Sequence, residues 1–231
     1  MAHRHTGVIA GRIVAACIVL GALPPVARAA VGGGRPGPSI VSLGLDGGGS
    51  DGASFTPAIS ASGRYVAFAS AASSLVKRDT NGSEDVFVYD RKKRTTERVS
   101  LSSAGAQAGG ASFDPAISAD GRFVAFTSAA PDLVPGDDNG QVDVFVRDRQ
   151  RGETVLASVG PQGARGDGPS VAPAISADGR FVAFESDAGT LVHGDGNHTG
   201  DVFVHDLAGG VTRLVSVAGN GQQTESPSFG A

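Results

Sequence analysis

The chain has 231 residues, of which 40% are apolar and 35 are glycine, and it contains no tryptophan. Its formal net charge of −4 excludes the broadly basic surface that is typical of nucleic-acid-binding proteins. The only cysteine is Cys17, which excludes an internal disulfide and a multi-cysteine metal site. A glycine-rich chain of valine, alanine and phenylalanine with frequent turn residues predicts many short strands, so the expected class is all-β.

The first 29 residues have the order of a secretory signal peptide. Arg4 and Arg12 precede an apolar stretch at 13–23, and Ala27-Arg28-Ala29 matches a small-x-small cleavage site. The apolar stretch is too short to span a bilayer, and no later segment is apolar enough to do so. We therefore expect an exported protein, periplasmic or extracellular, with no transmembrane segment in the mature chain. Residues 30–38 read as a Gly/Pro linker.

One segment of 58 residues occurs three times. Pro57-Ala58-Ile59-Ser60 returns at 115–118 and 173–176, and Asp85-Val86-Phe87-Val88 returns at 143–146 and 201–204. Residues 115–148 and 173–206 are identical at 24 of 34 positions. Such self-similarity at a fixed period predicts one structural unit stacked against its copies. The predicted units are 54–111, 112–169 and 170–224, preceded by a lone outer strand and loop at 39–53 and followed by the start of a further unit at 225–231.

Each unit divides into four short strands, which in the second copy are predicted at 112–118, 122–128, 143–148 and 154–159. Asp120-Gly121 is a strong hairpin turn, because both residues tolerate positive φ. The second strand is apolar on both faces, so the sheet needs a neighbour on each side. Radial stacking of four-stranded antiparallel sheets is a β-propeller, which closes with 4–8 blades. Three full blades predict a partial or truncated propeller, either a fragment or one closed by self-association; a β-sandwich is disfavoured by the constant spacing.

A recurring motif links the chain to a known family. Ser-Ala-Asp-Gly-Arg-Phe-Val-Ala-Phe-x-Ser stands at 118–128 and 176–186, and blade 1 has the variant Ser60-Ala61-Ser62-Gly63. The motif resembles the blade motif of TolB-like, WD-like β-propellers, and the resemblance covers residues 39–231. It implies an envelope scaffold, a partner-docking platform or an accessory domain of a peptidase. The first of three expected functions is an exported non-enzymatic scaffold or protein-binding module with a protein or envelope partner. The third is an accessory propeller of a secreted hydrolase, and the second rests on the acidic loops.

The second expectation is a calcium-binding adhesive or ligand-binding propeller. The loop between the second and third strands carries oxygen-bearing side chains at alternate positions, which suits Ca²⁺, and it resembles a shortened FG-GAP calcium loop. Asx-turns explain the same residues without a metal. Ca²⁺ is the one cofactor that the sequence suggests, and its candidate ligands are Asp79, Asn81, Ser83, Asp85, Asp137, Asn139, Gln141, Asp143, Asp195, Asn197, Thr199 and Asp201.

Other repeated polar residues are assigned to structure. The arginine after each first hairpin is expected to pair with an aspartate at the end of the third strand: Arg64, Arg122 and Arg180 with Asp90, Asp148 and Asp206. Ser118 and Asp120 belong to a turn, and no serine has a repeated histidine partner, so no catalytic nucleophile is predicted. His193, His198 and His205 vary between copies and are expected to be exposed.

Overall fold

The computed structural model describes residues 39–197, 199–223 and 226–228. The predicted signal peptide and linker lie outside the described residues, as does most of the segment predicted to begin a further blade. The described residues from Ser39 onward belong to one structural unit. No helix within the described part of the chain is long and apolar enough to cross a membrane.

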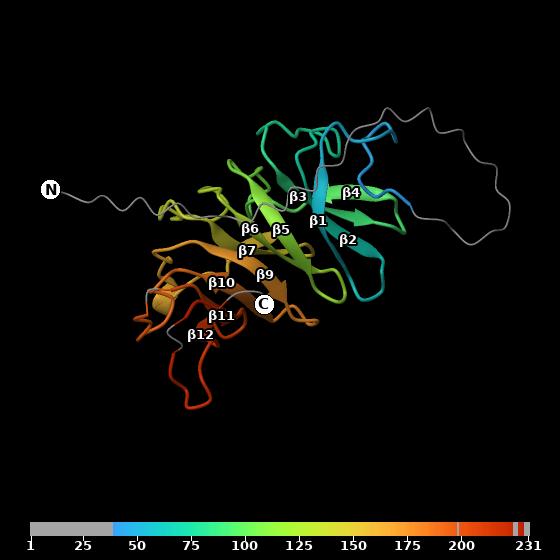
Figure 1. Ribbon diagram of the computed structural model, residues 1–231. Helices are drawn as coiled ribbons and strands as arrows, with labels where there is room; N and C mark the ends of the chain where they lie inside the picture. The colour runs from blue at the N-terminus through green and yellow to red at the C-terminus, as the bar shows by residue number, and fades with distance from the viewer. Residues whose placement is uncertain (1–38, 198, 224–225, 229–231) are drawn as a thin grey trace. The chain divides into compact units, whose positions relative to one another are not determined.

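Twelve strands form three antiparallel sheets of four, and each sheet keeps the order of the sequence (Figure 1). Blade 1 contains β1 (Ser54–Ile59), β2 (Tyr65–Ser70), β3 (Asp85–Asp90) and β4 (Thr95–Arg98). Blade 2 contains β5 (Ser112–Ile117), β6 (Phe123–Ser128), β7 (Asp143–Asp148) and β8 (Glu153–Leu156). Blade 3 contains β9 (Ser170–Ile175), β10 (Phe181–Ser186), β11 (Asp201–Asp206) and β12 (Val211–Leu214). The only helix among the described residues is one 3-10 turn, Pro161–Gly163, so the all-β prediction is confirmed.

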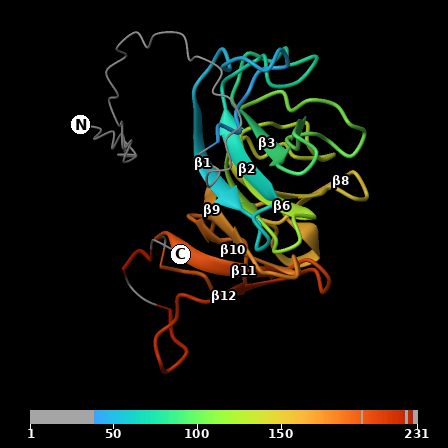
Figure 2. The ribbon, with the colours of Figure 1, turned by 90° about the vertical axis from the view of Figure 1, so that its right-hand side faces the viewer.

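The three sheets stack side by side in chain order (Figures 1 and 2). Their first strands, β1, β5 and β9, approach one another, so the fourth strands lie on the outside. The backbone N–H of Ala61 donates to the carbonyl of Ala119 at 3.1 Å, and that of Ala119 donates to Ala177 at 3.0 Å. The repeated contact makes these sheets three blades of a partial β-propeller, as predicted.

The hydrophobic core lies between blades rather than within one. Phe126 and Phe145 stack with their ring centroids 5.9 Å apart and face the alanine and valine side of blade 1, including Ala67 and Val88. The same packing recurs one blade later, where Phe184 meets the equivalent side of blade 2. A sheet that is apolar on both faces is therefore buried by its neighbours.

The two end blades are buried to different extents. Val215 of blade 3 is 46% exposed, whereas its counterpart Val99 in blade 1 is 1% exposed. The aromatic side of blade 1 is covered by Val41, which packs against the cluster containing Phe68 and Phe87. The strand predicted at 39–53 is reduced to a single β-bridge between residues 43 and 49. Self-association that closes the ring stays a prediction.

The fourth strand of blade 2, predicted at 154–159, ends earlier than predicted. It ends at Leu156, because the backbone N–H groups of Ala157 and Ser158 both point at the carbonyl of Val144, at 2.8 and 3.3 Å. The N–H of Val159 then donates to Ala157 rather than across the sheet. The chain leaves the sheet here and crosses to the next blade, which places the connecting segment beside the outer strands.

Candidate functional site

The predicted arginine–aspartate pairs form in all three blades. Arg122 donates to Asp148 through Nε at 3.0 Å and Nη2 at 2.5 Å, and Arg64 makes the same two contacts with Asp90. Asp148 also accepts the backbone N–H groups of the following turn, at 3.0 and 3.2 Å. Its pKa is lowered chiefly by the hydrogen bond from Arg122. These pairs tie the first hairpin to the second and are structural.

The serine and aspartate of the first hairpin belong to the turn. Ser118 Oγ donates to Asp120 Oδ1 at 2.7 Å and accepts the backbone N–H of Phe123 at 3.0 Å. Asp120 Oδ1 also accepts the backbone N–H of Arg122 at 2.9 Å. These contacts cap the hairpin, so the interpretation as turn chemistry accounts for both side chains.

Each acidic loop brings two of its four predicted ligands together, the asparagine and the second aspartate. In blade 1, Asn81 Nδ2 donates to Asp85 Oδ2 at 3.2 Å, and Asn81 Oδ1 accepts the backbone N–H of Ser83 at 3.0 Å. Ser100 Oγ, from the chain beyond β4, donates to Asp85 Oδ1 at 2.6 Å. The same contacts recur in the other loops, through Asn139 with Asp143 and Asn197 with Asp201. The asparagine thus turns its NH₂ group, not its oxygen, toward the carboxylate.

A glutamine that sequence analysis missed closes two of the three loops. Gln107 Nε2 donates to Asp79 Oδ1 at 2.8 Å and to Asp85 Oδ2 at 2.9 Å. In blade 3, Gln223 Nε2 makes the same two contacts with Asp195 and Asp201, at 2.6 and 2.8 Å. The glutamine comes from the segment that links two blades, so only its recurrence after two repeats could have signalled it.

Blade 2 lacks this bridge. Its residue at the glutamine position is Arg165, whose guanidinium turns outward to the carbonyls of Pro135 and Gly136. Asp137 is 8% exposed, and its Oδ1 has no hydrogen-bond partner. Burial, followed by the charge of Asp143, raises the pKa of Asp137 to about 6. No group of three His, Cys, Asp or Glu side chains suited to a metal occurs within the described ranges.

The expectation of exposed histidines is wrong for His205. Its side chain is 4% exposed, Nδ1 lies 2.9 Å from Thr212 Oγ1, and burial lowers its pKa. His205 stands at the position of Arg147 in blade 2, and its partner Thr212 donates to the carbonyl of Val159, in the segment that links blade 2 to blade 3. His193 is exposed, and position 198 lies outside the described residues.

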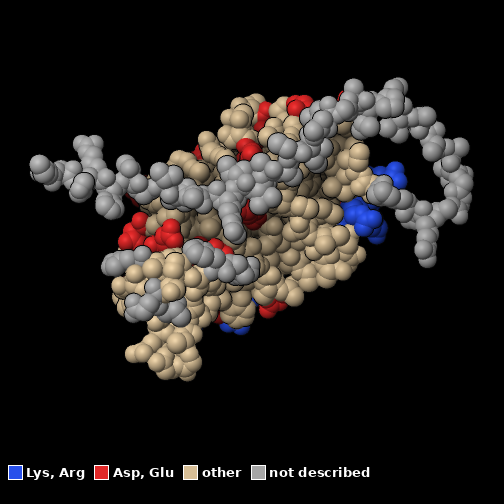
Figure 3. All heavy atoms as spheres, in the orientation of Figure 1, with Lys and Arg blue, Asp and Glu red and all other residues tan. Residues whose placement is uncertain are grey.

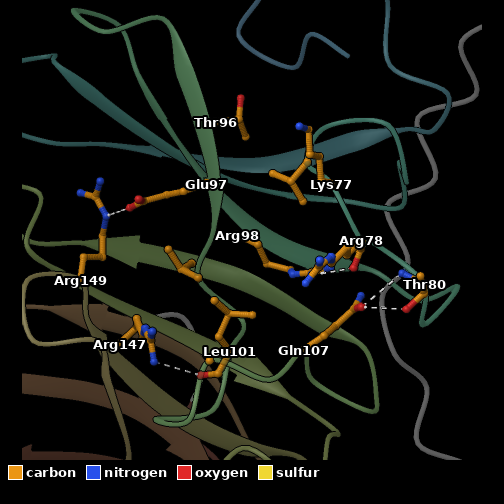
Figure 4. Close-up of a pocket in the computed structure, with 13 residues that line it drawn as sticks. Lys77, Arg78, Thr80, Thr96, Glu97, Arg98, Leu101, Gln107, Arg147 and Arg149 are labelled. Carbon is orange, nitrogen blue, oxygen red and sulfur yellow. Dashed lines mark hydrogen bonds and ion pairs between the residues drawn. The ribbon is translucent and has the colours of Figure 1, made fainter. Parts of the chain in front are cut away.

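A pocket of about 670 Å³ opens between the outer parts of blades 1 and 2 (Figure 4). Lys77, Arg78 and Arg98 approach it from the β2–β3 loop and β4, and Arg147 and Arg149 approach from β7 and the turn after it. These five cationic side chains face one acidic lining residue, Glu97. Arg98 pairs with Asp79 and Asp85, and Arg149 pairs with Glu97, so the positive charge of the pocket comes from Lys77, Arg78 and Arg147.

The two most buried guanidinium groups of the pocket differ in whether their charge is compensated. Arg147 is 9% exposed and donates from Nη1 to the carbonyl of Ser102 at 2.9 Å and to Thr154 Oγ1 at 3.0 Å, but it forms no ion pair with a described residue. Burial lowers its pKa. Arg98, by contrast, pairs with Asp79 at 3.1 Å and with Asp85 at 3.3 Å, so its charge is compensated, although its Nε has no acceptor. Buried cations are ordinarily paired, so Arg147 favours an anionic ligand.

The exposed cations of the pocket are also unpaired. Lys77 and Arg78 are exposed and form no ion pair with any residue that the structure describes, whereas Arg149 is held by Glu97 and stacks over the ring of Tyr65 at 4.6 Å. The equivalent positions between blades 2 and 3 hold no lysine or arginine; they are Pro135, Gly136, Leu156, His205 and Leu207. The junction of blades 2 and 3 has a cation at another lining position, where Arg165 replaces Gln107, so it is the cluster of five cations that is particular to one junction.

Charge is otherwise dispersed over the surface. On the described part of the face in Figure 3, acidic groups are scattered and a small basic patch lies at the right-hand edge, with neutral atoms over most of the area. Sequence analysis missed the pocket because its cations are some 50 to 70 residues apart and vary between repeats. Only their absence from the other copies could have drawn attention to them.

The sheets, their order and their stacking define the chain as part of a β-propeller. It is similar to TolB from Acinetobacter baumannii, with a TM-score of 0.44 and 16% identity over 74% of this chain and 34% of that one. It is similar to a putative TolB from Agrobacterium tumefaciens, with a TM-score of 0.47 and 18% identity over 76% of this chain and 53% of that one. It is also similar to the propeller domain of the Trilobed protease from Pyrococcus furiosus, with a TM-score of 0.44 and 12% identity over 71% of this chain and 42% of that one.

The chain thus spans about a third of the first solved structure and half of the second. No known family model and no curated protein matches the sequence. The similarity is one of fold, so the function is argued from the pocket and the loops.

Proposed function

We propose that this chain is an exported, non-enzymatic propeller module that binds a partner protein by holding carboxylate side chains in the pocket between blades 1 and 2. The observation that carries the proposal is Arg147, a buried guanidinium that lines the pocket without an ion-pair partner among the described residues. A bound carboxylate supplies the missing negative charge.

A carboxylate-bearing segment of a protein fits this pocket better than a nucleic acid does. Guanidinium groups present a planar fork of donors that matches a carboxylate in two parallel hydrogen bonds. The lining also includes Val76, Val99 and Leu101, which suit the aliphatic parts of peptide side chains. The net charge of −4 opposes a long polyanion, because the field outside the pocket is repulsive to it.

A non-enzymatic role is supported by the use of the repeated polar groups in structure. Ser118 and Asp120 cap a hairpin, and Ser100 is bonded to buried Asp85. The buried histidine His205 is bonded to Thr212, which in turn donates to the carbonyl of Val159. A screen with ester, peptide, phosphate and glycoside substrates is expected to show no turnover; an activity that purifies with the chain would overturn this part of the proposal.

Binding is tested by fluorescence anisotropy with a labelled octaglutamate peptide. Replacing Lys77 and Arg78 by glutamate is expected to weaken binding at least tenfold, since both exposed side chains line the pocket without making a structural contact. The matched control replaces Lys92 and Lys93, which lie in the exposed turn after β3, and is expected to change binding less than twofold. Equal losses of peptide affinity in both variants would contradict the proposal. Tight binding of inorganic phosphate without any binding of the peptide would contradict it as well.

Export rests on the sequence of residues 1–29 and has its own test. Expression of the full chain in a secreting bacterial host is expected to give a mature protein that begins at Ala30, because the predicted cleavage follows Ala29. The measurement is N-terminal sequencing of the fraction outside the cytoplasm. An uncleaved chain that stays in the cytoplasm would refute export without touching the binding proposal.

A further inference from the structure

The three acidic loops are close copies, yet the groups that donate hydrogen bonds to their two aspartates differ from blade to blade. In blade 1 the carboxylates of Asp79 and Asp85 share the amide of Gln107 and the guanidinium of Arg98. In blade 3 the two carboxylates share the amide of Gln223, and Leu214 stands at the position of Arg98. In blade 2 neither donor is present, because the arginine position of β4 is occupied by Leu156 and the glutamine position by an outward-turned Arg165.

The middle loop therefore keeps an incomplete carboxylate. Asp143 is satisfied by Asn139 Nδ2 at 2.8 Å and Ser158 Oγ at 2.6 Å. Asp137 is more than nine-tenths buried, and its Oδ1 has no partner. This atom is the counterpart of the Asp79 and Asp195 oxygens that accept the bridging amide in the other blades, so it is directed at the place where that amide would lie.

From this contrast we infer that the loop of blade 2, alone among the three, binds one divalent cation between Asp137 and Asp143. Two carboxylates balance a charge of +2, and hard oxygen ligands select a cation such as Ca²⁺. The ion takes the place that the glutamine amide fills elsewhere, and water completes its coordination. The inference narrows the calcium prediction to one site, and it stands independently of the basic pocket.

The affinity follows from the small number of acidic ligands. Sites with few carboxylates on extracellular modules bind Ca²⁺ with Kd on the order of 10⁻⁴ to 10⁻³ M. At 5 mM Ca²⁺ such a site is largely filled, which raises the melting temperature because the ion binds only the folded chain. Isothermal titration of the metal-free full chain with CaCl₂ at pH 7.5 is expected to give one site per chain.

The chain supplies its own matched variants. Arg165→Gln installs the residue found in the other two blades; it is expected to abolish calcium binding and to raise the melting temperature without calcium. Asp137→Asn is expected to abolish binding as well. Asp79→Asn, in the loop already closed by Gln107, is the control and is expected to leave the calcium isotherm unchanged.

Several outcomes would overturn the inference: no heat and no thermal shift at 5 mM Ca²⁺, three sites per chain, or binding that survives Arg165→Gln. A melting temperature that responds to pH but not to calcium would show that a proton, not a cation, relieves Asp137. Arg165 donates hydrogen bonds only to exposed backbone carbonyls, although its charge also lowers the pKa of Asp137. Its variant therefore removes no hydrogen bond between side chains and still tests the inference if Asp137→Asn fails to fold. Circular dichroism verifies the fold of each variant.

Discussion

Arg122 and Asp148, 26 residues apart, form a two-point ion pair that joins the first hairpin of blade 2 to the turn after its third strand. Removing the carboxylate with Asp148→Ala also strips two backbone N–H groups of their acceptor, so the expected cost is about 1–3 kcal/mol in the free energy of unfolding. Arg122→Ala is expected to cost less, because the turn keeps its acceptor. Chemical denaturation measures both changes.

The ion pair of Arg122 and Asp148 also predicts how the stability of the fold depends on pH. Arg122 lowers the folded pKa of Asp148 below its unfolded value, so the stabilisation is present above about pH 4 and is lost as the pH falls through the folded pKa. The difference in stability between the wild type and Asp148→Asn is therefore expected to shrink on acidification below pH 4. A difference that is constant from pH 7 to pH 2 would contradict the assignment.

Gly121 is required for two separate reasons, which Gly63 allows to be distinguished. Both adopt positive φ, 77° and 68°, but a side-chain methyl at Gly121 would overlap the ring of Tyr65, whereas at Gly63 the nearest atom is Arg91 Nη1 at 3.6 Å. We expect Gly63→Ala to cost about 1 kcal/mol from backbone strain and Gly121→Ala to cost more, since the contact between blades must also shift. Equal losses on thermal unfolding would refute this contact.

The junction between blades carries the core, so a large-to-small change there is expected to be severe. Phe126→Ala empties a fully buried site in the cluster between blades 1 and 2 and is expected to cost about 3–5 kcal/mol. Val211→Ala, at a position 47% exposed, is the control and is expected to change stability by less than about 0.5 kcal/mol. Comparable losses, measured in urea, would mean that the blades do not bury each other as described.

Asp137 gives a pH dependence of the opposite sign. Its folded pKa of about 6 lies above the unfolded value, so the ionised group destabilises the fold at neutral pH, and this penalty disappears as the pH falls from 6 to 4. In calcium-free buffer, Asp137→Asn is expected to be more stable than the wild type at pH 7 by about 1–2 kcal/mol after allowance for screening. At pH 4 the two proteins should be equally stable, which thermal unfolding across the pH range measures.

Local pattern predicted much of this structure. The 58-residue period located the three sheets, and the Asp-Gly turns located the first hairpins of blades 2 and 3, with Ser62-Gly63 as the variant in blade 1. The repeated spacing of Arg122 and Asp148 predicted their pairing. These features depend on contacts within one blade, so each copy of the sequence encodes them independently. The third strand of blade 2, Asp143–Asp148, has the predicted bounds, whereas the fourth strand of that blade ends earlier because the chain turns out of the sheet toward the next blade.

The features that only the tertiary structure determined are contacts between blades. Arg78 and Arg147 are 69 residues apart and meet in one pocket because two sheets stack, and Gln107 reaches an acidic loop from a segment that links two blades. His205 is buried for the same reason, although its variation between repeats suggested exposure. A repeated sequence determines its unit by short-range pairing, whereas the packing of unit on unit selects which variable side chains share a site.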